Sequence, residues 1–177
     1  GIIAGPATLK ELRDALLDFK EYSGKPIYAY NEIYTQKSLY IASVCDSIIL
    51  NPQGMIEFSG MSANVAYYKN VLEKIGVKPE IIRGSNNKFK SAVEPFIENE
   101  MSEANRKQLT SLLEGIWGEY KSAVASGRNM TVEEVQSFSD KFAIHTPELA
   151  LENNMVDVLW YEDQLLDFMK DICKVDD

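Results

Sequence analysis

One lysine in this sequence lies where a polar loop gives way to an apolar stretch. Lys90 belongs to the segment Lys88–Phe96, which follows the glycine-containing loop Arg83–Asn87 and contains Pro95. Partial burial against the apolar residues that follow would disfavour the ammonium form, which is how a lysine becomes a general base near neutral pH. Lowering a lysine pKa from about 10.4 to about 7 requires a differential of roughly 4–5 kcal/mol. A solvated surface lysine is the ordinary alternative.

A lysine base needs a nucleophile, most naturally a serine hydroxyl in a Ser-Lys arrangement. Ser91 is adjacent to the lysine, but neighbouring side chains seldom converge on one reacting atom. The sequence does not single out another serine, since none lies in a recognised nucleophile motif. The remaining candidates by composition are Ser38, Ser43, Ser59 and Ser62.

Other kinds of chemistry find little support in the residue patterns. The sequence contains no Walker-type phosphate loop, no Gly-x-Gly-x-x-Gly and no Gly-x-Ser-x-Gly elbow, so we expect no nucleotide cofactor. One histidine, His145, and two cysteines, Cys45 and Cys173, lack metal-ligand spacing and predict neither a metal site nor a disulfide framework. We predict that Cys45 is a buried structural thiol and that His145 faces solvent at a helix start.

Size and charge limit the class of protein further. A chain of 177 residues fits one domain with a real core, and 27 acidic against 18 basic residues give a net charge of −9. This balance argues against nucleic acid and anionic lipid as partners. No apolar run approaches the ~18–20 residues of a membrane helix, and Gly1 does not begin a signal peptide. The opening Gly1–Pro6 is typical of a strand end, so we expect residues 1–177 to be one domain of a longer chain, with any membrane anchor upstream.

Apolar periodicity predicts alternating helices and strands in the first half of the chain. Thr8 and Glu11 form a capping-box pattern at the start of a helix over 8–22, which Gly24 ends. Short alternating elements favour βα crossover units and a largely parallel sheet. We predict strands over 26–30, 47–50, 55–58 and 77–83, helices over 37–45 and 66–75, and a turn at 51–54.

The second half of the chain is predicted to be mainly helical. A long helix over 102–125 is expected to end at Gly127, and Thr131 with Glu134 forms a second capping-box pattern. The later segments are a short helix over 131–135, a helix over 147–153, the run 155–159 that follows it, and a closing segment over 162–172.

The residues around Lys90 also resemble a motif of a known protease family. Lys88–Phe96 is similar to the Lys-Ser-Ala-x-Glu-Pro-Phe segment of the signal peptide peptidase A (protease IV) family. The resemblance continues in order along nearly the whole chain. It implies an α/β fold, namely a crotonase-like (Clp-protease-like) spiral with βα units and a helical carboxy-terminal part, and no cofactor. The other matching segments are 24–30, 39–48, 51–54, 67–69, 150–153 and 156–157.

The resemblance implies a catalytic role for Lys90. Family members use a Ser-Lys dyad, and in the long form two homologous domains lie in tandem, the first supplying the lysine and the second the serine. This sequence resembles the first domain, with Lys90 at the catalytic lysine. Where the serine-bearing domain has Ala-Ser-Gly-Gly-Tyr-Tyr-Ile-Ala, this chain has Thr35–Ala42, so Gln36 occupies the nucleophile position and Lys37 the oxyanion-hole glycine. The domain alone is therefore expected to be inactive.

The resemblance also implies a cellular setting. We expect a domain of a membrane-associated serine endopeptidase, on the periplasmic face of the bacterial inner membrane, that degrades residual signal peptides. The full-length protein is expected to be a homo-oligomer, most simply a tetramer, with apolar pockets at its interfaces. The turn Ser59–Ser62 could line such a pocket or be an ordinary connection.

Two alternatives remain open. The first is a non-catalytic, crotonase-like oligomerisation domain in which Lys90 makes a surface or interface salt bridge. The second is an acyl-CoA enzyme of the crotonase superfamily, which the acidic balance and the lack of a recognisable catalytic glutamate disfavour.

Overall fold

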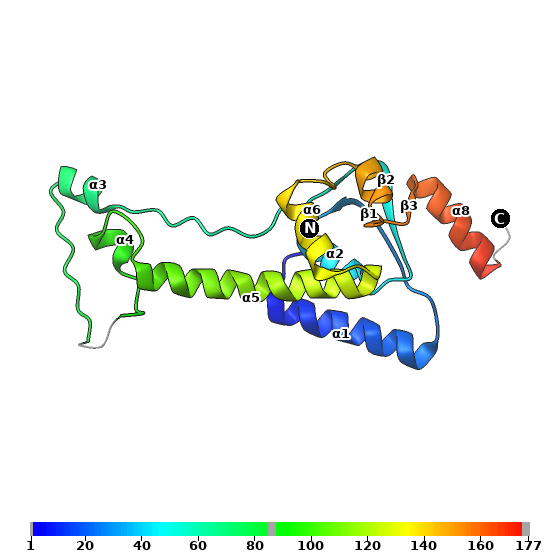
Figure 1. Ribbon diagram of the computed structural model, residues 1–177, viewed down its shortest axis with the longest axis horizontal. Coiled ribbons are helices and arrows are strands. Elements are labelled where there is room, and N and C mark those ends of the chain that lie inside the picture. The colour runs from blue at the N-terminus through cyan, green and yellow to red at the C-terminus, as the bar shows by residue number, and fades with distance from the viewer. Residues whose placement is uncertain (1, 85–87, 175–177) are drawn as a thin grey trace. The chain divides into compact units, whose positions relative to one another are not determined.

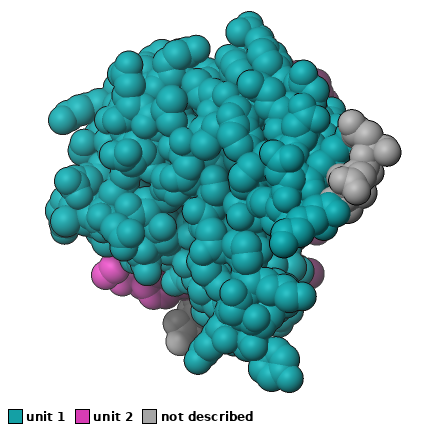
Figure 2. All heavy atoms as spheres, turned by 90° about the vertical axis from the view of Figure 1, so that its right-hand side faces the viewer, with its two compact units in different colours: residues 1–60, 118–177 teal, residues 61–117 magenta. Residues whose placement is uncertain are grey.

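The computed structural model describes residues 2–84 and 88–174 and divides into two compact units. Unit 1 combines residues 1–60 with 118–177, and unit 2 comprises residues 61–117, as the two colours of Figure 2 show. The order of the helices and strands can be followed in Figure 1. The long helix α5, Glu103–Arg128, contributes residues to both units.

Unit 1 is built on a small parallel sheet. Its strands β1 (Tyr28–Tyr34), β2 (Ser47–Ile56) and β3 (Val158–Leu159) lie in the order β1-β2-β3. Both neighbouring pairs are parallel, with Tyr28 opposite Ser47 in the first. The predicted mixed α/β class and the parallel sheet are therefore confirmed.

The strand β2 is longer than its sequence suggests. The turn predicted at 51–54 is wrong, because β2 continues through these residues to Ile56, and the strand predicted separately over 55–58 is the end of β2 as far as Ile56. β3 pairs with β2 only at Ile49 and Leu50, so Pro52 breaks no ladder to β3. The register of β1 shifts between Asn31 and Ile33, and a β-carbon on Gly54 would meet the carbonyl oxygen of Glu32. The irregular pairing between β1 and β2 therefore accommodates Pro52 and Gly54 within β2.

The core of unit 1 lies between this sheet and its helices. Ile48, Ile49 and Leu50 are fully buried in succession, which is typical of a strand covered on both faces. Helix α2 contributes Leu39 and α5 contributes Val124 to the same buried set. The helices wholly within unit 1 are α1 (Pro6–Ser23), α2 (Gln36–Ala42), α6 (Val132–Asp140), α7 (Pro147–Glu152) and α8 (Glu162–Cys173).

The ends of the unit 1 helices follow local chemistry, with one correction. Helix α1 begins at Pro6 without a side-chain cap, so the capping box predicted at Thr8 is wrong. A proline in the first turn lacks only an N–H that the helix would leave unpaired there. The predicted end at Gly24 is confirmed by its left-handed φ of 63°, and the predicted capping box of Thr131 with α6 is present.

Unit 2 contains helices but little core. It holds α3 (Lys69–Lys74), α4 (Glu94–Ile97) and the first part of α5. The strand predicted over 77–83 is wrong: these residues are not in a strand, and Ile82 is fully exposed. None of the described hydrophobic side chains of unit 2 is buried, whereas the polar Glu94 and Asn105 are.

Helix α5 continues past its predicted end. The helix includes Gly127 and ends at Arg128. A β-carbon at Gly127 would collide with the carbonyl oxygen of Ser43, at the end of α2. This glycine therefore permits close approach of the two helices. In the described part of the chain no helix has both the length and the apolar character needed to cross a membrane.

Candidate active site

Lys90 lies in unit 2, just before the turn that leads into α4. Its side chain is exposed to solvent. The partial burial expected from the sequence is therefore not provided by this chain alone, because the apolar residues that follow the lysine do not cover it.

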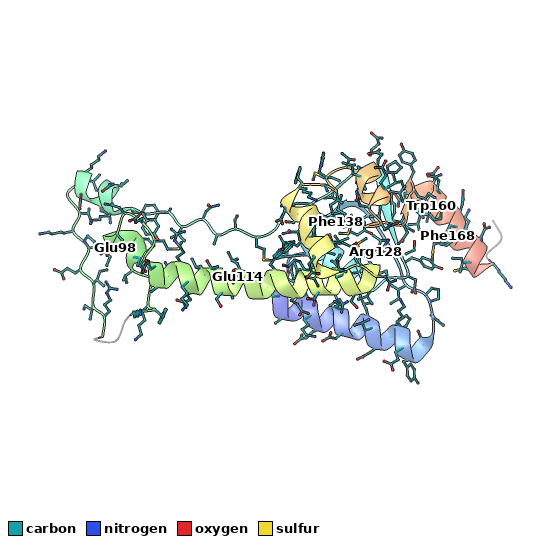
Figure 3. The ribbon with its side chains drawn as sticks, in the orientation of Figure 1. Glu98, Glu114, Arg128, Phe138, Trp160 and Phe168 are labelled. Carbon is teal, nitrogen blue, oxygen red and sulfur yellow. The ribbon has the colours of Figure 1, made fainter. Side chains whose placement is uncertain are left out.

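The backbone that follows Lys90 is firmly attached to its surroundings. The Glu94 N–H donates to the Ser91 carbonyl oxygen at 3.0 Å, and Glu98, labelled in Figure 3, donates its N–H to the Glu94 carbonyl at 2.9 Å. The Tyr68 N–H donates to the Pro95 carbonyl at 2.7 Å, at the start of α3. The short turn next to Lys90 is thus tied to a second segment of unit 2.

The carboxylate of Glu94 provides a second attachment, to the start of α5. It accepts from the Ser102 hydroxyl at 2.6 Å, from the Ser102 N–H at 3.3 Å and from the Asn105 side-chain amide at 2.9 Å. The Ser102 hydroxyl in turn accepts from the Asn105 N–H at 3.2 Å. Three donors therefore converge on one carboxylate at a helix N-terminus.

The electrostatics of Glu94 follow from these contacts. Burial by itself would raise the pKa of Glu94, but the hydrogen bonds from Ser102 and Asn105, with the nearby charge of Arg83, lower it below its usual value. The carboxylate is therefore ionised at neutral pH. Its contribution to stability is present above the pKa of the unfolded chain and is lost as pH falls through the folded pKa.

Sequence reasoning did not identify this network. Glu94 belongs to the family motif, yet its partners lie eight and eleven residues further on, beyond the reach of a local capping pattern. The available signal was Ser102 followed by acidic Glu103 at the start of the long helix, which marks a helix N-terminus.

Gln36, at the nucleophile position of the resemblance, is the first residue of α2 in unit 1. Its side-chain Nε2 donates to the Gly60 carbonyl at 2.9 Å, and its Oε1 accepts from the Gly60 N–H at 2.7 Å. The neighbouring Lys37 donates from Nζ to the Ala4 carbonyl at 2.9 Å. Both side chains make structural contacts in unit 1, and an amide is no substitute for a serine nucleophile.

The serines within α2 and directly after it also make hydrogen bonds. The Ser38 hydroxyl donates to the Thr35 carbonyl at 3.0 Å, and the Ser43 hydroxyl donates to the Tyr40 carbonyl at 2.7 Å. Both serines are buried. Ser59 is exposed in unit 1, and Ser62 is exposed in unit 2, the unit that contains Lys90.

An open cavity in unit 2 offers an apolar surface. Met61, from the turn that the sequence nominated as a pocket wall, lines it together with residues of α5. Glu114, labelled on α5 in Figure 3, contributes the charged part of the lining. The α5 residues of the lining are Thr110, Leu113, Glu114 and Trp117.

His145 and Cys45 are the other potentially reactive side chains considered from the sequence. His145 is exposed, as predicted, and its ring stacks on Phe142 with centroids 4.8 Å apart. Cys45 is half-buried rather than fully buried, and burial raises the pKa of its thiol to about 11. The reactive thiolate is therefore disfavoured at Cys45.

Comparison with known proteins defines the class. Residues 20–176 match the family model described as peptidase family S49. The chain therefore belongs to peptidase family S49, in agreement with the motif around Lys90.

Several curated relatives share this similarity. The chain is 32% identical over 163 residues to Protease 4 of Salmonella typhi, covering 88% of this chain and 26% of the relative. It is 36% identical over 121 residues to Protease 4 of Haemophilus influenzae, covering 68% and 19%. It is 26% identical over 167 residues to the chloroplastic serine protease SPPA of Arabidopsis thaliana, covering 94% and 24%. The chain thus spans about a quarter or less of the length of these relatives.

Proposed function

We propose that this chain is the lysine-bearing domain of a Ser-Lys dyad endopeptidase. Membership of a serine protease family with Protease 4 relatives supports the reaction class. In this proposal both units form one domain of a longer chain, because the family match runs through both. The partner serine comes from a second domain outside residues 1–177, and the complete fold is the crotonase-like spiral.

One observation carries the proposal. The motif lysine, Lys90, is solvent-accessible and directly precedes a turn that is hydrogen-bonded to Tyr68 and to Ser102. The side chain of Gln36, by contrast, is hydrogen-bonded to Gly60. The chain thus presents a lysine that another domain can reach. At the position aligned with the nucleophile it has the Gln36 amide, which is hydrogen-bonded to Gly60.

The proposed chemistry is acyl transfer. Neutral Lys90 removes the proton of the serine hydroxyl as the serine oxygen attacks the scissile carbonyl carbon, and the resulting ammonium protonates the leaving amine. Water, deprotonated by the same lysine, then attacks the acyl carbonyl carbon, and the lysine ammonium returns a proton to the serine oxygen as the ester bond breaks. Because the neutral form of a lysine requires removal from water, the serine-bearing domain and the bound substrate must cover Lys90 during the reaction.

The proposed substrates are hydrophobic peptides, residual signal peptides in particular. The apolar part of the cavity beside Met61 supports this choice. The proposed location is the periplasmic face of the bacterial inner membrane, with an anchor elsewhere in the full-length chain. No nucleic acid partner is proposed for a chain with a net charge of −9.

A homo-oligomer, most simply a tetramer, is part of the proposal. Unit 2 exposes eight large hydrophobic side chains, which a subunit interface would remove from water. These residues are Tyr68, Val71, Ile75, Val77, Ile82, Phe89, Phe96 and Leu112.

The test compares two neighbouring lysines in the full-length protein. Lys90→Ala should lower kcat for a fluorogenic apolar peptide by about 10²–10⁴-fold, because the general base is lost. Lys88→Ala removes another exposed lysine of the same segment and should leave kcat within about twofold. Thermal unfolding of both variants should match that of the parent protein. A Lys90→Ala variant that retains normal kcat would refute the assignment.

The 177-residue chain alone should not hydrolyse the same peptide. Turnover that co-purifies with this chain through successive columns would place the nucleophile within it. Single alanine substitutions of its serines would then identify that residue.

The non-catalytic oligomerisation domain remains the second candidate, and the exposed apolar surface of unit 2 favours it. Under this alternative Lys90→Ala would change the oligomeric state and leave the turnover of each assembled protein unchanged. Sedimentation velocity combined with kcat on the same samples separates the two functions.

A further inference from the structure

Glu94 is an unusual residue for unit 2. Its side chain is only 8% exposed, in a unit whose described hydrophobic residues are all at least partly exposed. Burial of a carboxylate is costly unless hydrogen bonds replace its water, and here Ser102 and Asn105 supply three. A small unit whose described residues include no buried hydrophobic side chain thus holds a buried carboxylate with three hydrogen-bond donors.

The location of this charge connects it to Lys90. Glu94 follows Lys90 by four residues, and its N–H donates to the Ser91 carbonyl at 3.0 Å, so the two residues flank one backbone turn. On its other side the Glu94 carboxylate reaches the first turn of α5 through Asn105. The turn that follows the lysine is therefore attached to the 26-residue helix α5 through the Glu94 side chain.

We propose that Glu94 is a positioning residue for Lys90: by bonding to Ser102 and Asn105, its carboxylate fixes the turn 91–94 and hence the backbone from which the lysine extends. This inference rests on the proposed function of Lys90 as the general base. Glu94 is assigned no contact with substrate and no proton transfer of its own.

A carboxylate suits this task better than a neutral side chain. Its two oxygens accept all three donors at once, and its negative charge is favoured by the partial positive charge of a helix N-terminus. Glutamine has one acceptor oxygen: at the position of Oε2 it would keep the bonds from the Ser102 N–H and from Asn105, and it would turn its N–H₂ group towards the Ser102 hydroxyl. Alanine would leave the donors of Ser102 and Asn105 unpaired.

The expected effect is on catalysis more than on binding. A base that is misplaced by about 1 Å can lower a rate by about 10²-fold. Because the Glu94 carboxylate is bonded to Ser102 and Asn105 and is assigned no contact with substrate, its loss should lower kcat by about 10- to 100-fold and leave KM within about twofold.

The experiment uses the full-length protein, an apolar fluorogenic peptide and two glutamates. Glu94→Ala removes the helix-capping carboxylate next to Lys90. Glu134→Ala is the matched control, because Glu134 accepts from the Thr131 N–H at 2.8 Å at the start of α6 in the other unit. We expect Glu94→Ala to lose kcat at constant KM, and Glu134→Ala to keep both constants.

Two further variants keep the test decisive if Glu94→Ala does not fold. Ser102→Ala removes the 2.6 Å hydrogen bond and should lower kcat by about three- to tenfold. Glu94→Gln should retain more activity than Ser102→Ala, because the glutamine oxygen can replace Oε2, which accepts from both the Ser102 N–H and Asn105. Equal losses of kcat in Glu134→Ala and Glu94→Ala, or full kcat in both Ser102→Ala and Glu94→Gln, would overturn the inference.

Lys90→Ala in the same series separates this inference from the proposed function. If Lys90→Ala is inactive and the Glu94 and Ser102 variants keep full kcat, Lys90 remains the base and Glu94 has no positioning role. If Lys90→Ala is fully active, the proposed function fails first, and the inference fails with it.

Discussion

Gln36 has a structural role at the position that the resemblance aligns with a nucleophile. Its amide is complementary to the peptide group of Gly60, donating to the carbonyl and accepting from the N–H. Serine is too short to make both bonds. At the scale of one residue, the Gln36 side chain therefore joins the start of α2 to Gly60 within unit 1.

Gln36→Ala should destabilise the chain by about 1–2 kcal/mol, because it leaves both polar groups of the partly buried Gly60 without their partner. The free energy of unfolding in urea measures this loss. Gln53→Ala is the matched control, since the exposed Gln53 side chain makes only a 3.4 Å bond to the adjacent Pro52 and should change stability by less than about 0.5 kcal/mol. Equal effects of the two substitutions would contradict the structural role of Gln36.

At the scale of elements, α5 depends on where its glycines lie. Gly127 faces the Ser43 backbone with no room for a β-carbon, whereas a β-carbon at Gly118 would meet nothing within 4 Å. Tyr120 and Tyr40 stack in the same interface, with ring centroids 4.8 Å apart. The contact between α5 and α2 therefore places one glycine under a steric requirement and leaves the other with only the entropic cost of a helical glycine.

Gly127→Ala should destabilise the chain by about 1–3 kcal/mol, because α5 and α2 must move apart. Gly118→Ala in the same helix should stabilise it by about 0.5–1 kcal/mol, because alanine is the better helix former. Thermal and urea unfolding of the two variants measure both changes in the free energy of unfolding. A stabilising Gly127→Ala would show that the helix approach is not restrictive.

At the scale of the whole molecule, the two units differ in how they are stabilised. Unit 1 has a sheet, a continuous apolar core and the ion pair of Arg128 with Asp157 at 2.6 Å; Arg128 is labelled near the end of α5 in Figure 3. The described part of unit 2 relies on short helices and on the bonds around Glu94. Few buried apolar contacts mean a low free energy of local opening.

Hydrogen exchange of the isolated 177-residue chain should reveal this difference. Peptides covering α3 (Lys69–Lys74), which has no buried residue, should exchange within seconds to minutes, while those covering β2 (Ser47–Ile56) should approach the protection of global unfolding. Mass spectrometry of quenched samples gives both rates. Equal protection of α3 and β2 would argue that unit 2 is as stable as unit 1. In the proposed oligomer, protection of α3 should rise.

Local sequence patterns were sufficient for most of unit 1. Helix α6 has its predicted capping box, α1 ends at Gly24, and the buried run 48–50 forms a strand, because each depends on residues within one or two turns. The same reasoning failed at residues 51–54 and 77–83. There the outcome depended on which neighbouring strands were present, and a local window does not contain that information.

The protease family and the candidate lysine can both be recognised from the amino-acid sequence, because the motif around Lys90 consists of contiguous residues. Only the tertiary structure decided that Lys90 is exposed, that Gln36 bonds to Gly60 and that Glu94 is buried at the start of α5. Solvent exposure and hydrogen-bond partners depend on residues that are 8 to 24 positions apart in these cases. Folding brings those residues together, and local propensities do not specify such pairs.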